Sequence, residues 1–360
     1  MSIEGEVLRS PGDVTPGWLT RVMGPVVGGV VVGVEAEPVG TGQMGECMRY
    51  RLQWEPTGAT GPGSVVVKFT SPDETSRATA MATRSYEREV LFYRTLAGTV
   101  DIRTPRCWHA AFDPDTGDFD LVLEDLAPAV QGDQIRGCTV DEAAAVVGEL
   151  AALQAPRWDD SNLSSLEWLQ IRDDESADFV AGLYRGALEG FLEGLGSRLE
   201  SETTELVQRF GAVIDTWLRG RNEGPSVITH GDFRLDNMMF DPSGGRVTVV
   251  DWQGPGLGDP TADLSYFLGA GLKPEDRRTH EEDLVALHHE LLRSRGVEGF
   301  GVEQCWWGYR YQAFGGLVMA VIASQIVVRT ERGDEMFSTM ANRHARQVID
   351  LESESLVEGG

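Results

Sequence analysis

Residues 228–240 read ITHGDFRLDNMMF, an apolar segment interrupted by a histidine, two aspartates, an arginine and an asparagine. Burying such groups is costly unless each of them has a hydrogen-bond or charge partner. Ile228 at one end and residues 238–240 at the other can anchor the segment by packing, which would hold the polar residues in a rigid loop. The pattern therefore predicts a loop with chemically active side chains rather than a strand of the core.

The polar residues of this loop have a defined spacing. His230, Asp232 and Asn237 form the pattern HxDxxxxN, and Asp251 follows at the end of the apolar segment RVTVV. Phosphoryl transfer requires an acceptor hydroxyl that is oriented by a carboxylate, and a divalent metal that is held by oxygen ligands. Asp232 fits the first role, and Asn237 and Asp251 fit the second. His230 is expected to brace the loop rather than to titrate in the reaction.

Three glycines further upstream, Gly40, Gly42 and Gly45, form the pattern GxGxxG in PVGTGQMGECMRY. The pattern alone is weak, because glycines in a hairpin more often serve only the geometry of the turn. A dinucleotide-binding fold would need a helix directly after the glycines, whereas an alternating strand follows here. The remaining phosphate-binding interpretation is a glycine-rich hairpin whose backbone N–H groups approach a nucleotide.

Lys68 ends the predicted strand SVVVKFT and is one of only two lysines in the chain, the other being Lys273. A surface lysine at the end of a strand is the simpler interpretation of this residue alone. After a glycine-rich hairpin, however, such a lysine can reach the phosphates of a nucleotide if a carboxylate on the next helix holds it. Glu89 is the preferred partner and Glu87 is the alternative, because the spacing does not separate them.

The composition limits the classes of partner. The chain has 360 residues, 41% hydrophobic content and a net charge of -26, which indicates a globular protein whose field repels nucleic acid and anionic membranes. The N-terminus lacks a secretory pattern, and the apolar segment GLVMAVIASQIVV is too short to span a bilayer. The cysteines are far apart and include no CxxC pair, as in reduced proteins. We expect a cytoplasmic protein with no nucleic-acid or membrane partner, and a homodimer is left open.

The periodicity changes near residue 128. Before it, helices are predicted over residues 13–24 and 85–98, and alternation predicts strands. These strands cover residues 30–39, 46–54, 64–70, 107–112 and 118–126. After it, helices are predicted over residues 141–154, 178–195 and 202–220 and beyond residue 278, with a strand pair over 236–240 and 246–252. We expect a sheet-rich lobe over residues 1–127, a helical lobe over 128–350 and a disordered tail over 351–360.

Together these motifs resemble the aminoglycoside phosphotransferase and choline kinase-like superfamily, small-molecule relatives of protein kinases. The segments HGDFRLDNMMF, VVDWQ, GDPTADLSYFL and LVLEDL are most similar to its ecdysteroid kinase-like branch and to phosphotransferase domains found beside acyl-CoA dehydrogenases. The resemblance, which runs from about residue 15 to about residue 350, implies an α+β, bilobal, protein-kinase-like fold. It also implies ATP and Mg²⁺ as cofactors, a hydroxylated small molecule as acceptor, and adenine contacts from backbone groups of Glu124 and Leu126.

The sequence departs from protein kinases in ways that bear on regulation. Gly231 stands where protein kinases keep an arginine that reads a phosphorylated activation loop, and DWQ replaces DFG. Gly258 follows Asp251 so closely that no activation loop or peptide platform fits between them. Asp259 and Asp263 then lead into a helix, and Asp263 is expected to support the catalytic loop by accepting backbone N–H bonds. These departures indicate a constitutively competent kinase for a small molecule.

Arg234 lies two residues after Asp232, where protein kinases carry a lysine near the transferring phosphate. We predict that Arg234 offsets the charge of the γ-phosphate, and an ion pair with Asp236 or another acid is an equal alternative.

Two further clusters carry weaker signals. The aromatic residues of CWWGYRYQAFGG could line an acceptor pocket, although such clusters are more often core. They are Trp306, Trp307, Tyr309 and Tyr311. His288 and His289 are adjacent on a predicted helix and therefore diverge, so solvated or core histidines explain them better than a metal site.

The favoured function is thus a Mg-ATP-dependent kinase that phosphorylates a hydroxyl of a small molecule. The alternative from another class is a catalytically inactive nucleotide-binding or partner-binding protein on a kinase scaffold. Inactive relatives usually lack the base or a metal ligand, whereas this chain retains a residue for every role. Within the enzyme class, an aminoglycoside-type antibiotic resistance kinase competes with a kinase for a metabolite or a lipid-like alcohol.

Overall fold

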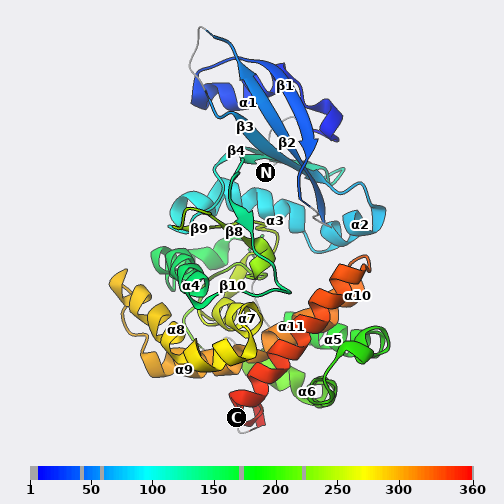
Figure 1. Ribbon diagram of the computed structural model, residues 1–360, viewed down its shortest axis with the longest axis vertical. Coiled ribbons are helices and arrows are strands. Elements are labelled where there is room, and N and C mark those ends of the chain that lie inside the picture. Colours follow the sequence, from blue (N-terminus) through cyan, green and yellow to red (C-terminus); the bar gives the residue numbers. More distant parts are fainter. Residues whose placement is uncertain (1–6, 41–43, 57–60, 170–173, 221–223, 359–360) are drawn as a thin grey trace. The chain divides into compact units, whose positions relative to one another are not determined.

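The computed structural model describes residues 7–40, 44–56, 61–169, 174–220 and 224–358 (Figure 1). The chain forms two compact units. The smaller unit comprises residues 1–98, 104–128 and 251–253, and the larger unit comprises residues 99–103, 129–250 and 254–360. The smaller unit is built on an antiparallel sheet and the larger unit is mainly helical, so the α+β class predicted from the sequence is confirmed.

The smaller unit contains a five-stranded antiparallel sheet in the order β1-β2-β3-β5-β4. Its strands are β1 (Val31–Pro38), β2 (Gly45–Trp54), β3 (Ser64–Thr70), β4 (Cys107–Phe112) and β5 (Phe119–Glu124). The helices of this unit are α1 (Pro16–Val27), α2 (Glu74–Ala82) and α3 (Ser85–Leu91).

Different helices cover the two faces of this sheet. Val65 and Val67 of β3 belong to one core cluster with Trp18 of α1. Leu121 of β5 belongs to a second cluster with residues of α3. Because side chains alternate along a strand, Lys68 of β3 lies on the face that α3 covers. The alternation of the strand thus determines which helix can supply a partner for the lysine.

Local signals explain where the helices of this unit begin and end. The Thr15 side chain accepts a hydrogen bond from Trp18 N at 3.2 Å, and α1 ends at Gly28 with a φ of 75°. The predicted helix over residues 85–98 is α-helical only to Leu91, and a π-helical turn over Phe92–Leu96 follows. Helix α2 has no counterpart in the sequence prediction, because its composition is polar.

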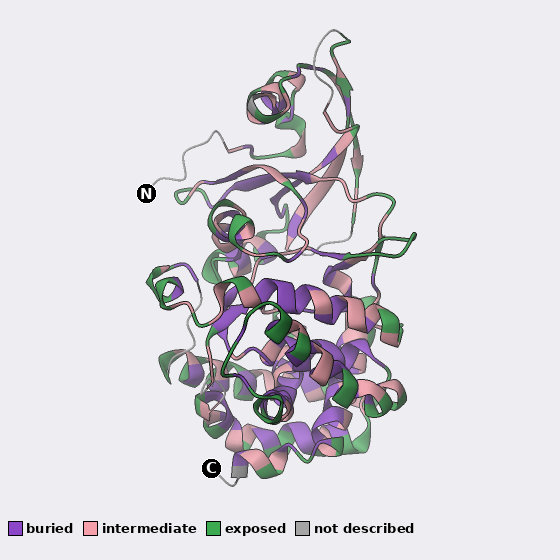
Figure 2. Ribbon diagram, turned by 90° about the vertical axis from the view of Figure 1, so that its left-hand side faces the viewer, coloured by how far each residue is buried: buried purple, intermediate pink, exposed green. Residues whose placement is uncertain are grey.

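The larger unit contains nine α-helices within its described residues. They are α4 (Val140–Gln154), α5 (Asp174–Leu195), α6 (Ser201–Gly220), α7 (Ala262–Gly271), α8 (Pro274–Ser294), α9 (Val302–Tyr311), α10 (Gly315–Ile326), α11 (Glu331–Asp350) and α12 (Glu354–Glu358). In Figure 2 the buried positions lie along the inner faces of these helices. Among the described residues, no helix combines the length and the apolar character needed to cross a membrane.

Two small sheets in the larger unit carry the predicted catalytic loop. One pairs β6 (Val130–Gln131), β8 (Met238–Phe240) and β9 (Val247–Val249), and the other pairs β7 (Val227–Thr229) with β10 (Gly256–Gly258). The loop therefore begins after a strand of one sheet and ends at a strand of the other.

The end of the chain differs from the disordered tail that the sequence predicts. Residues 351–358 are described, and Glu354–Glu358 form α12. Leu351 and Val357 are buried, and Arg310 donates two hydrogen bonds to the carbonyl of Leu351. The polar composition of ESESLVEGG concealed these anchors, because disorder was inferred from average polarity.

Candidate functional site

The loop over residues 230–237, which the sequence predicts to be catalytic and which is called the catalytic loop below, is anchored at both ends by buried apolar residues. Ile228 on β7 and Met238 on β8 are fully buried, and residues Leu235–Asn237 form a short 3₁₀ turn between them. Phe233, between the polar residues, is also buried. Packing thus fixes the backbone on which the polar side chains are mounted.

Asp232 accepts hydrogen bonds from three side chains. Arg234 Nε lies 3.0 Å from both carboxylate oxygens, Asn237 Nδ2 donates to Oδ2 at 3.0 Å, and the Tyr266 hydroxyl donates to Oδ1 at 2.9 Å. Burial alone would raise the pKa of Asp232, but the charge of Arg234, together with the hydrogen bonds from Arg234 and Tyr266, outweighs burial and holds this pKa below its ordinary value. The carboxylate is therefore ionised at neutral pH and held in one orientation.

His230 braces the backbone of the same loop. Its ring is fully buried, and its two nitrogens contact Val250 O at 3.0 Å and Asp232 N at 3.3 Å. Since the Asp232 N–H donates to Nδ1, the ring hydrogen lies on Nε2, which donates to the Val250 carbonyl. This ring links the catalytic loop to the residue that precedes Asp251.

Two aspartates that follow β10 hold the backbone near the loop. Asp263 on α7 accepts hydrogen bonds from the N–H groups of His230 at 2.6 Å and Gly231 at 3.2 Å. Asp259 accepts the N–H of Thr261 at 2.8 Å, which holds the start of α7. Asp263 thus contacts the catalytic loop directly.

Gly231 lies where the loop passes close to the backbone that follows Asp251. Its φ is 83°, and a Cβ atom at this position would lie 2.3 Å from the carbonyl oxygen of Gly254. Any larger residue would therefore strain the backbone and also displace Gly254. The sequence explained Gly231 by the arginine that it replaces, and the structure adds a steric reason.

Lys68 of the smaller unit lies between two carboxylates. Its Nζ is 2.9 Å from Glu89 Oε1 and 2.6 Å from Asp251 Oδ1. Glu87, the alternative partner, instead pairs with Arg84 at 2.7 Å. The structure therefore brings Glu89, and not Glu87, to Lys68.

The pKa shifts in this trio follow from its burial and charges. Burial alone would lower the pKa of Lys68, but Asp251 and Glu89 raise it above its ordinary value, so the ammonium stays charged. Burial raises the pKa of Glu89 to about 6, against the opposing effect of Lys68. Glu89 is only 1% exposed and is thus the carboxylate that is costly to ionise.

Asp251 adopts a left-handed backbone conformation, with a φ of 67°. This conformation is uncommon for residues other than glycine and is often found at functional sites. The next residue, Trp252, is fully buried and stacks on Phe92 with 3.8 Å between ring centroids. Trp252 is thus a hydrophobic anchor in the DWQ segment, and the π-helical turn supplies its partner.

The glycine-rich segment is described only in part. Gly40 has a φ of 78°, which favours glycine, and Gly42 lies outside the described residues. A Cβ atom at Gly45 would lie 3.0 Å from Phe69 O and 3.3 Å from Lys68 Cε. Gly45 therefore allows β2 to pass close to the lysine.

In the segment predicted to contact adenine, the side chains of Glu124 and Asp125 form hydrogen bonds to neighbouring residues of the smaller unit. Glu124 Oε2 accepts the Arg106 N–H at 3.0 Å, and Asp125 binds Arg49 at 2.7 Å and the Ser64 hydroxyl at 2.6 Å. These bonds fix the backbone of Glu124 and Leu126. Adenine contacts through that backbone remain a prediction.

Asn237 and Asp251, taken separately, each have an oxygen of the kind that binds a hard divalent cation. Asn237 Nδ2 bonds to the carbonyl and carboxylate of Asp232, and within the described residues no donor contacts its Oδ1. Asp251 Oδ1 bonds to Lys68, whereas no described donor contacts its Oδ2, and the side chain is 36% exposed. One amide oxygen and one carboxylate oxygen are thus available, which are ligands that Mg²⁺ prefers.

Arg234 forms the ion pair with Asp236 that the sequence left open as an alternative to a role at the γ-phosphate. In addition to Asp232, its Nη1 binds Asp236 Oδ2 at 2.7 Å and lies 3.1 Å from Met336 Sδ. Asp236 accepts a further hydrogen bond from Gln134 N at 3.0 Å. A role of Arg234 at the γ-phosphate stays a prediction.

Two of the four aromatic residues in the cluster on α9 are core, and Trp306 is half-buried. Tyr309 and Tyr311 are buried, and their hydroxyls donate to Glu281 at 2.7 Å and to the Trp217 carbonyl at 3.2 Å. Only Trp307 is well exposed, at 42%. His288 is fully buried and its Nε2 lies 2.8 Å from Gln154 Oε1, so it is a core histidine.

Tyr266 is the contact of Asp232 that sequence reasoning missed. It lies on α7, which is apolar over almost its whole length, so nothing distinguishes it from a core tyrosine. Its position shortly after Asp263, in DLSYFL, was the only signal that could have indicated it.

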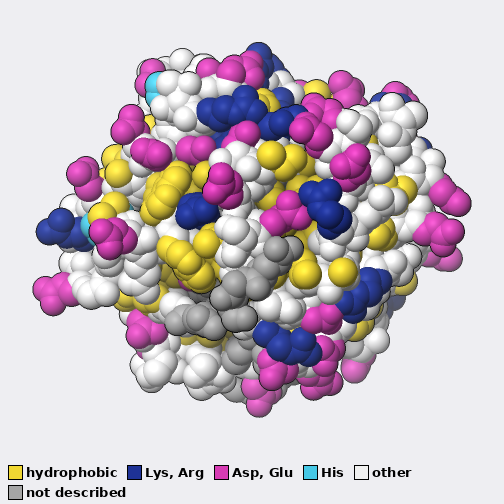
Figure 3. All heavy atoms as spheres, turned by 90° about the horizontal axis from the view of Figure 1, so that it is seen from below, with side chains coloured by type: hydrophobic (Ala, Val, Ile, Leu, Met, Phe, Trp, Pro, Cys, Tyr) yellow, Lys and Arg dark blue, Asp and Glu magenta, His cyan; other side chains and the backbone are white. Residues whose placement is uncertain are grey.

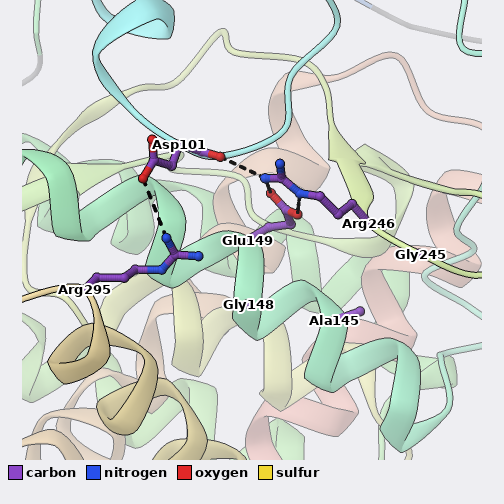
Figure 4. Close-up of a pocket in the computed structure, with 7 residues that line it drawn as sticks. All are labelled: Asp101, Ala145, Gly148, Glu149, Gly245, Arg246 and Arg295. Carbon is purple, nitrogen blue, oxygen red and sulfur yellow. Dashed lines mark hydrogen bonds and ion pairs between the residues drawn. The ribbon is translucent and has the colours of Figure 1, made fainter.

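A cavity of about 510 Å³ in the larger unit is lined by residues of other segments (Figure 4). Its charged residues pair with one another, since Arg246 binds Glu149 at 2.7 Å and Arg295 lies 3.6 Å from Asp101. It contains none of the predicted site residues. The contacts of the catalytic loop, and not the size of this cavity, identify the candidate site.

The chain is similar in part of its sequence, or in its fold, to several known proteins. The acyl-CoA dehydrogenase family member 11 of Rattus norvegicus is 33% identical over 100 residues, which cover 24% of this chain but only 13% of the rat protein. Choline kinase from Cryptosporidium parvum has a similar fold, with a TM-score of 0.54 and 10% identity over 91% of each chain. Aminoglycoside 2'-phosphotransferase-IIIa in complex with GDP has a TM-score of 0.53 and 13% identity, over 92% of this chain and 99% of that chain.

A family model described as the phosphotransferase enzyme family matches residues 49–296. This range contains Lys68, Glu89, Asp251 and the whole loop over residues 230–237. The chain therefore belongs to the phosphotransferase enzyme family.

Proposed function

We propose that the protein is an ATP-dependent kinase that transfers the γ-phosphate to a hydroxyl of a small molecule. The observation that carries this proposal is the set of contacts at Asp232, an ionised carboxylate held by Arg234, Asn237 and Tyr266. A scaffold that only bound nucleotide would have no use for a carboxylate held in this way. The complex of the aminoglycoside phosphotransferase with GDP supports a nucleotide as phosphate donor.

In the proposed reaction, the acceptor oxygen forms a bond to the γ-phosphorus while the bond from that phosphorus to the bridging oxygen of ATP breaks. ADP leaves with the electron pair, and the proton of the acceptor hydroxyl passes to the carboxylate of Asp232. Lys68, held by Glu89, binds the α- and β-phosphates. Arg234 offsets charge on the γ-phosphate, for which it would exchange one of its present carboxylate contacts.

Asn237 and Asp251 would hold Mg²⁺ through the two oxygens that the described donors leave uncontacted. The metal would neutralise charge on the phosphates during transfer. Asp251 has to release or share its bond with Lys68 as nucleotide binds, because the lysine is then drawn to phosphate oxygens. The two sets of residues belong to different units, and we propose that they act on the same nucleotide.

The acceptor is a hydroxylated small molecule whose class the site contacts leave open. Because the rat relative is named as an acyl-CoA dehydrogenase family member, hydroxyacyl thioesters belong in an acceptor screen. Aminoglycosides, amino alcohols, sugars and sterols complete the set. We propose a cytoplasmic location, as for most enzymes that consume ATP and small metabolites.

The decisive experiment is a screen for ADP release with Mg-ATP and each acceptor class. Acceptor-dependent ADP release, with phosphorylated product confirmed by mass spectrometry, is expected for one class. Tight Mg-ATP binding without turnover for any class would instead favour a nucleotide-binding scaffold. The screen also separates the antibiotic kinase from the metabolite kinase.

Two variants test the assigned roles separately. Asp232→Ala should keep the thermal shift that Mg-ATP produces and lower turnover by roughly 10²- to 10⁴-fold. Asp251→Asn should instead reduce the Mg²⁺-dependent part of the thermal shift. Undiminished turnover in the first variant, or a full Mg-ATP shift in the second, would remove the corresponding role.

A further inference from the structure

Tyr266 is the donor to Asp232 with the simplest set of contacts. Its hydroxyl lies 2.9 Å from Asp232 Oδ1, and its side chain is buried, with 7% exposure. Within the described residues it contacts no other acceptor. Burial and the charge of Asp232 raise the pKa of Tyr266 well above its ordinary value, so the hydroxyl remains a donor at any physiological pH.

The ring of Tyr266 stacks on the ring of His344, and two nearby glycines leave room for that histidine. His344 of α11 lies parallel to it, with 5.6 Å between ring centroids and an angle of 6°. A Cβ atom at Gly316 would lie 1.9 Å from His344 Nε2, and one at Gly269 would lie 2.5 Å from His344 Nδ1. The two glycines therefore leave the space that the imidazole fills, and the imidazole fixes the plane of the tyrosine.

The other two donors to Asp232 have further tasks. Arg234 also binds Asp236, and in the proposed reaction it turns toward the γ-phosphate. Asn237 has the amide oxygen that we assign to the metal. In the proposed reaction Arg234 exchanges a partner and Asn237 also serves the metal, whereas Tyr266 has no second acceptor among the described residues.

We propose that Tyr266 is a positioning residue, whose hydroxyl holds the Asp232 carboxylate in the orientation that receives the proton of the acceptor. This inference rests on the proposed kinase function. Tyr266 itself takes no part in bond making. It keeps one carboxylate oxygen in place while Arg234 exchanges partners, so the other oxygen can accept the hydroxyl of the acceptor.

The test compares two buried tyrosines that donate to carboxylates. Tyr266→Phe keeps the ring and its stack and removes only the hydroxyl. Tyr309→Phe, whose hydroxyl donates to Glu281 at 2.7 Å in the core, is the matched control for the loss of a buried bond. We expect Tyr266→Phe to lower kcat roughly 10- to 100-fold with KM for ATP unchanged, and Tyr309→Phe to leave kcat unchanged.

The probe is Mg-ATP with the best acceptor of the screen, or with water as acceptor if none is found. Equal kcat values for Tyr266→Phe and the wild type would overturn the proposal. So would an equal loss of kcat in both tyrosine variants, because the effect would then follow from stability alone.

A second measurement does not depend on turnover. Crystal structures of the wild type and of Tyr266→Phe should differ in the orientation of the Asp232 carboxylate, and an unchanged carboxylate would refute the positioning role. If the wild type transfers no phosphate to any acceptor or to water, the kinase function fails, and the carboxylate orientation still decides the role of Tyr266.

Discussion

At the scale of single residues, Lys68 is the positive charge that two carboxylates of the smaller unit share. It is a buried cation that contacts two carboxylates, and the deeper of these, Glu89, has a pKa raised to about 6 by burial. Removing one partner of a buried ion pair leaves an uncompensated charge, which destabilises more than the pair stabilised. The lysine therefore supports the fold as well as the proposed nucleotide contact.

We predict that Lys68→Met lowers the free energy of unfolding by about 3 kcal/mol at pH 8 and by less at pH 5. A carboxyl group with a raised folded-state pKa favours folding below its unfolded value, and this contribution is lost as the pH rises through the folded pKa. Glu89 without the lysine can stay protonated at pH 5 but must ionise at pH 8. Urea denaturation at both pH values measures the difference.

The matched control for this prediction is Arg84→Met. It breaks the exposed ion pair between Arg84 and Glu87, and Glu87 lies on α3 as Glu89 does. Arg84 and Glu87 are 45% and 23% exposed, so their pair should contribute less than about 1 kcal/mol. A Lys68→Met variant as stable as Arg84→Met at pH 8 would contradict the buried-pair argument.

The residues of the site differ in how far the sequence could predict them. Lys68 and Glu89 could be proposed from their order along the chain, but only packing separates Glu89 from Glu87, since both lie on α3. Tyr266 could not be proposed, because a tyrosine in an apolar helix has the same pattern whether its hydroxyl meets a backbone carbonyl or a catalytic carboxylate.

At the scale of elements, the short strands β7 and β10 bring the catalytic loop and the segment after Asp251 together. They pair over three residues each, with Ile228 opposite Leu257. Gly231 and Gly254 then approach closely beyond the end of this pair.

Gly231→Ala should therefore be more destabilising than an alanine at another glycine with the same backbone conformation. Gly244, with a φ of 80°, has no atom within 4 Å of the point where a Cβ would lie, so Gly244→Ala should cost only about 1–2 kcal/mol for the left-handed conformation. Gly231→Ala, with a φ of 83°, must also displace Gly254 and should cost about 2 kcal/mol more. Chemical denaturation of both variants tests this, and equal losses would argue against the close approach.

The elements that the sequence predicted well are those whose periodicity is set by one buried face. The strands over residues 46–54 and 64–70 alternate, and they correspond to β2 and β3. The strands β7 and β10 escaped prediction because three residues carry too little pattern, and their pairing depends on segments far apart in the sequence. The π-helical turn after α3 likewise follows from the stack of Phe92 on Trp252, a tertiary contact.

At the scale of the whole molecule, the chain has a net charge of -26. Figure 3 shows acidic side chains among basic and hydrophobic ones on the face seen from below. A strongly negative net charge opposes the binding of a polyanionic partner.

The response of the molecule to acid should depend on two buried histidines of the larger unit. Burial lowers the pKa of His288 to about 3 and that of His344 to about 4. His288 Nε2 lies 2.8 Å from Gln154 Oε1, a contact that joins α8 to α4. Because the unfolded chain takes up a proton at each histidine below about pH 6.5 and the folded chain does not, stability should fall as the pH decreases toward 4.

Replacing one of these histidines should reduce this dependence by a calculable amount. His288→Gln removes one proton of difference between the folded and unfolded states, so between pH 6 and pH 4.5 the slope of the unfolding free energy should fall by about 1.4 kcal/mol per pH unit. Glu89 acts in the opposite direction in this window, since its folded-state pKa is raised, but it contributes equally to the wild type and the variant. Urea denaturation at several pH values, with His280→Gln on the same helix as the matched loss of an imidazole, measures the slope. A His288→Gln slope equal to that of the wild type would mean that His288 takes up a proton in the folded state, and the acid sensitivity would then have to come from other groups.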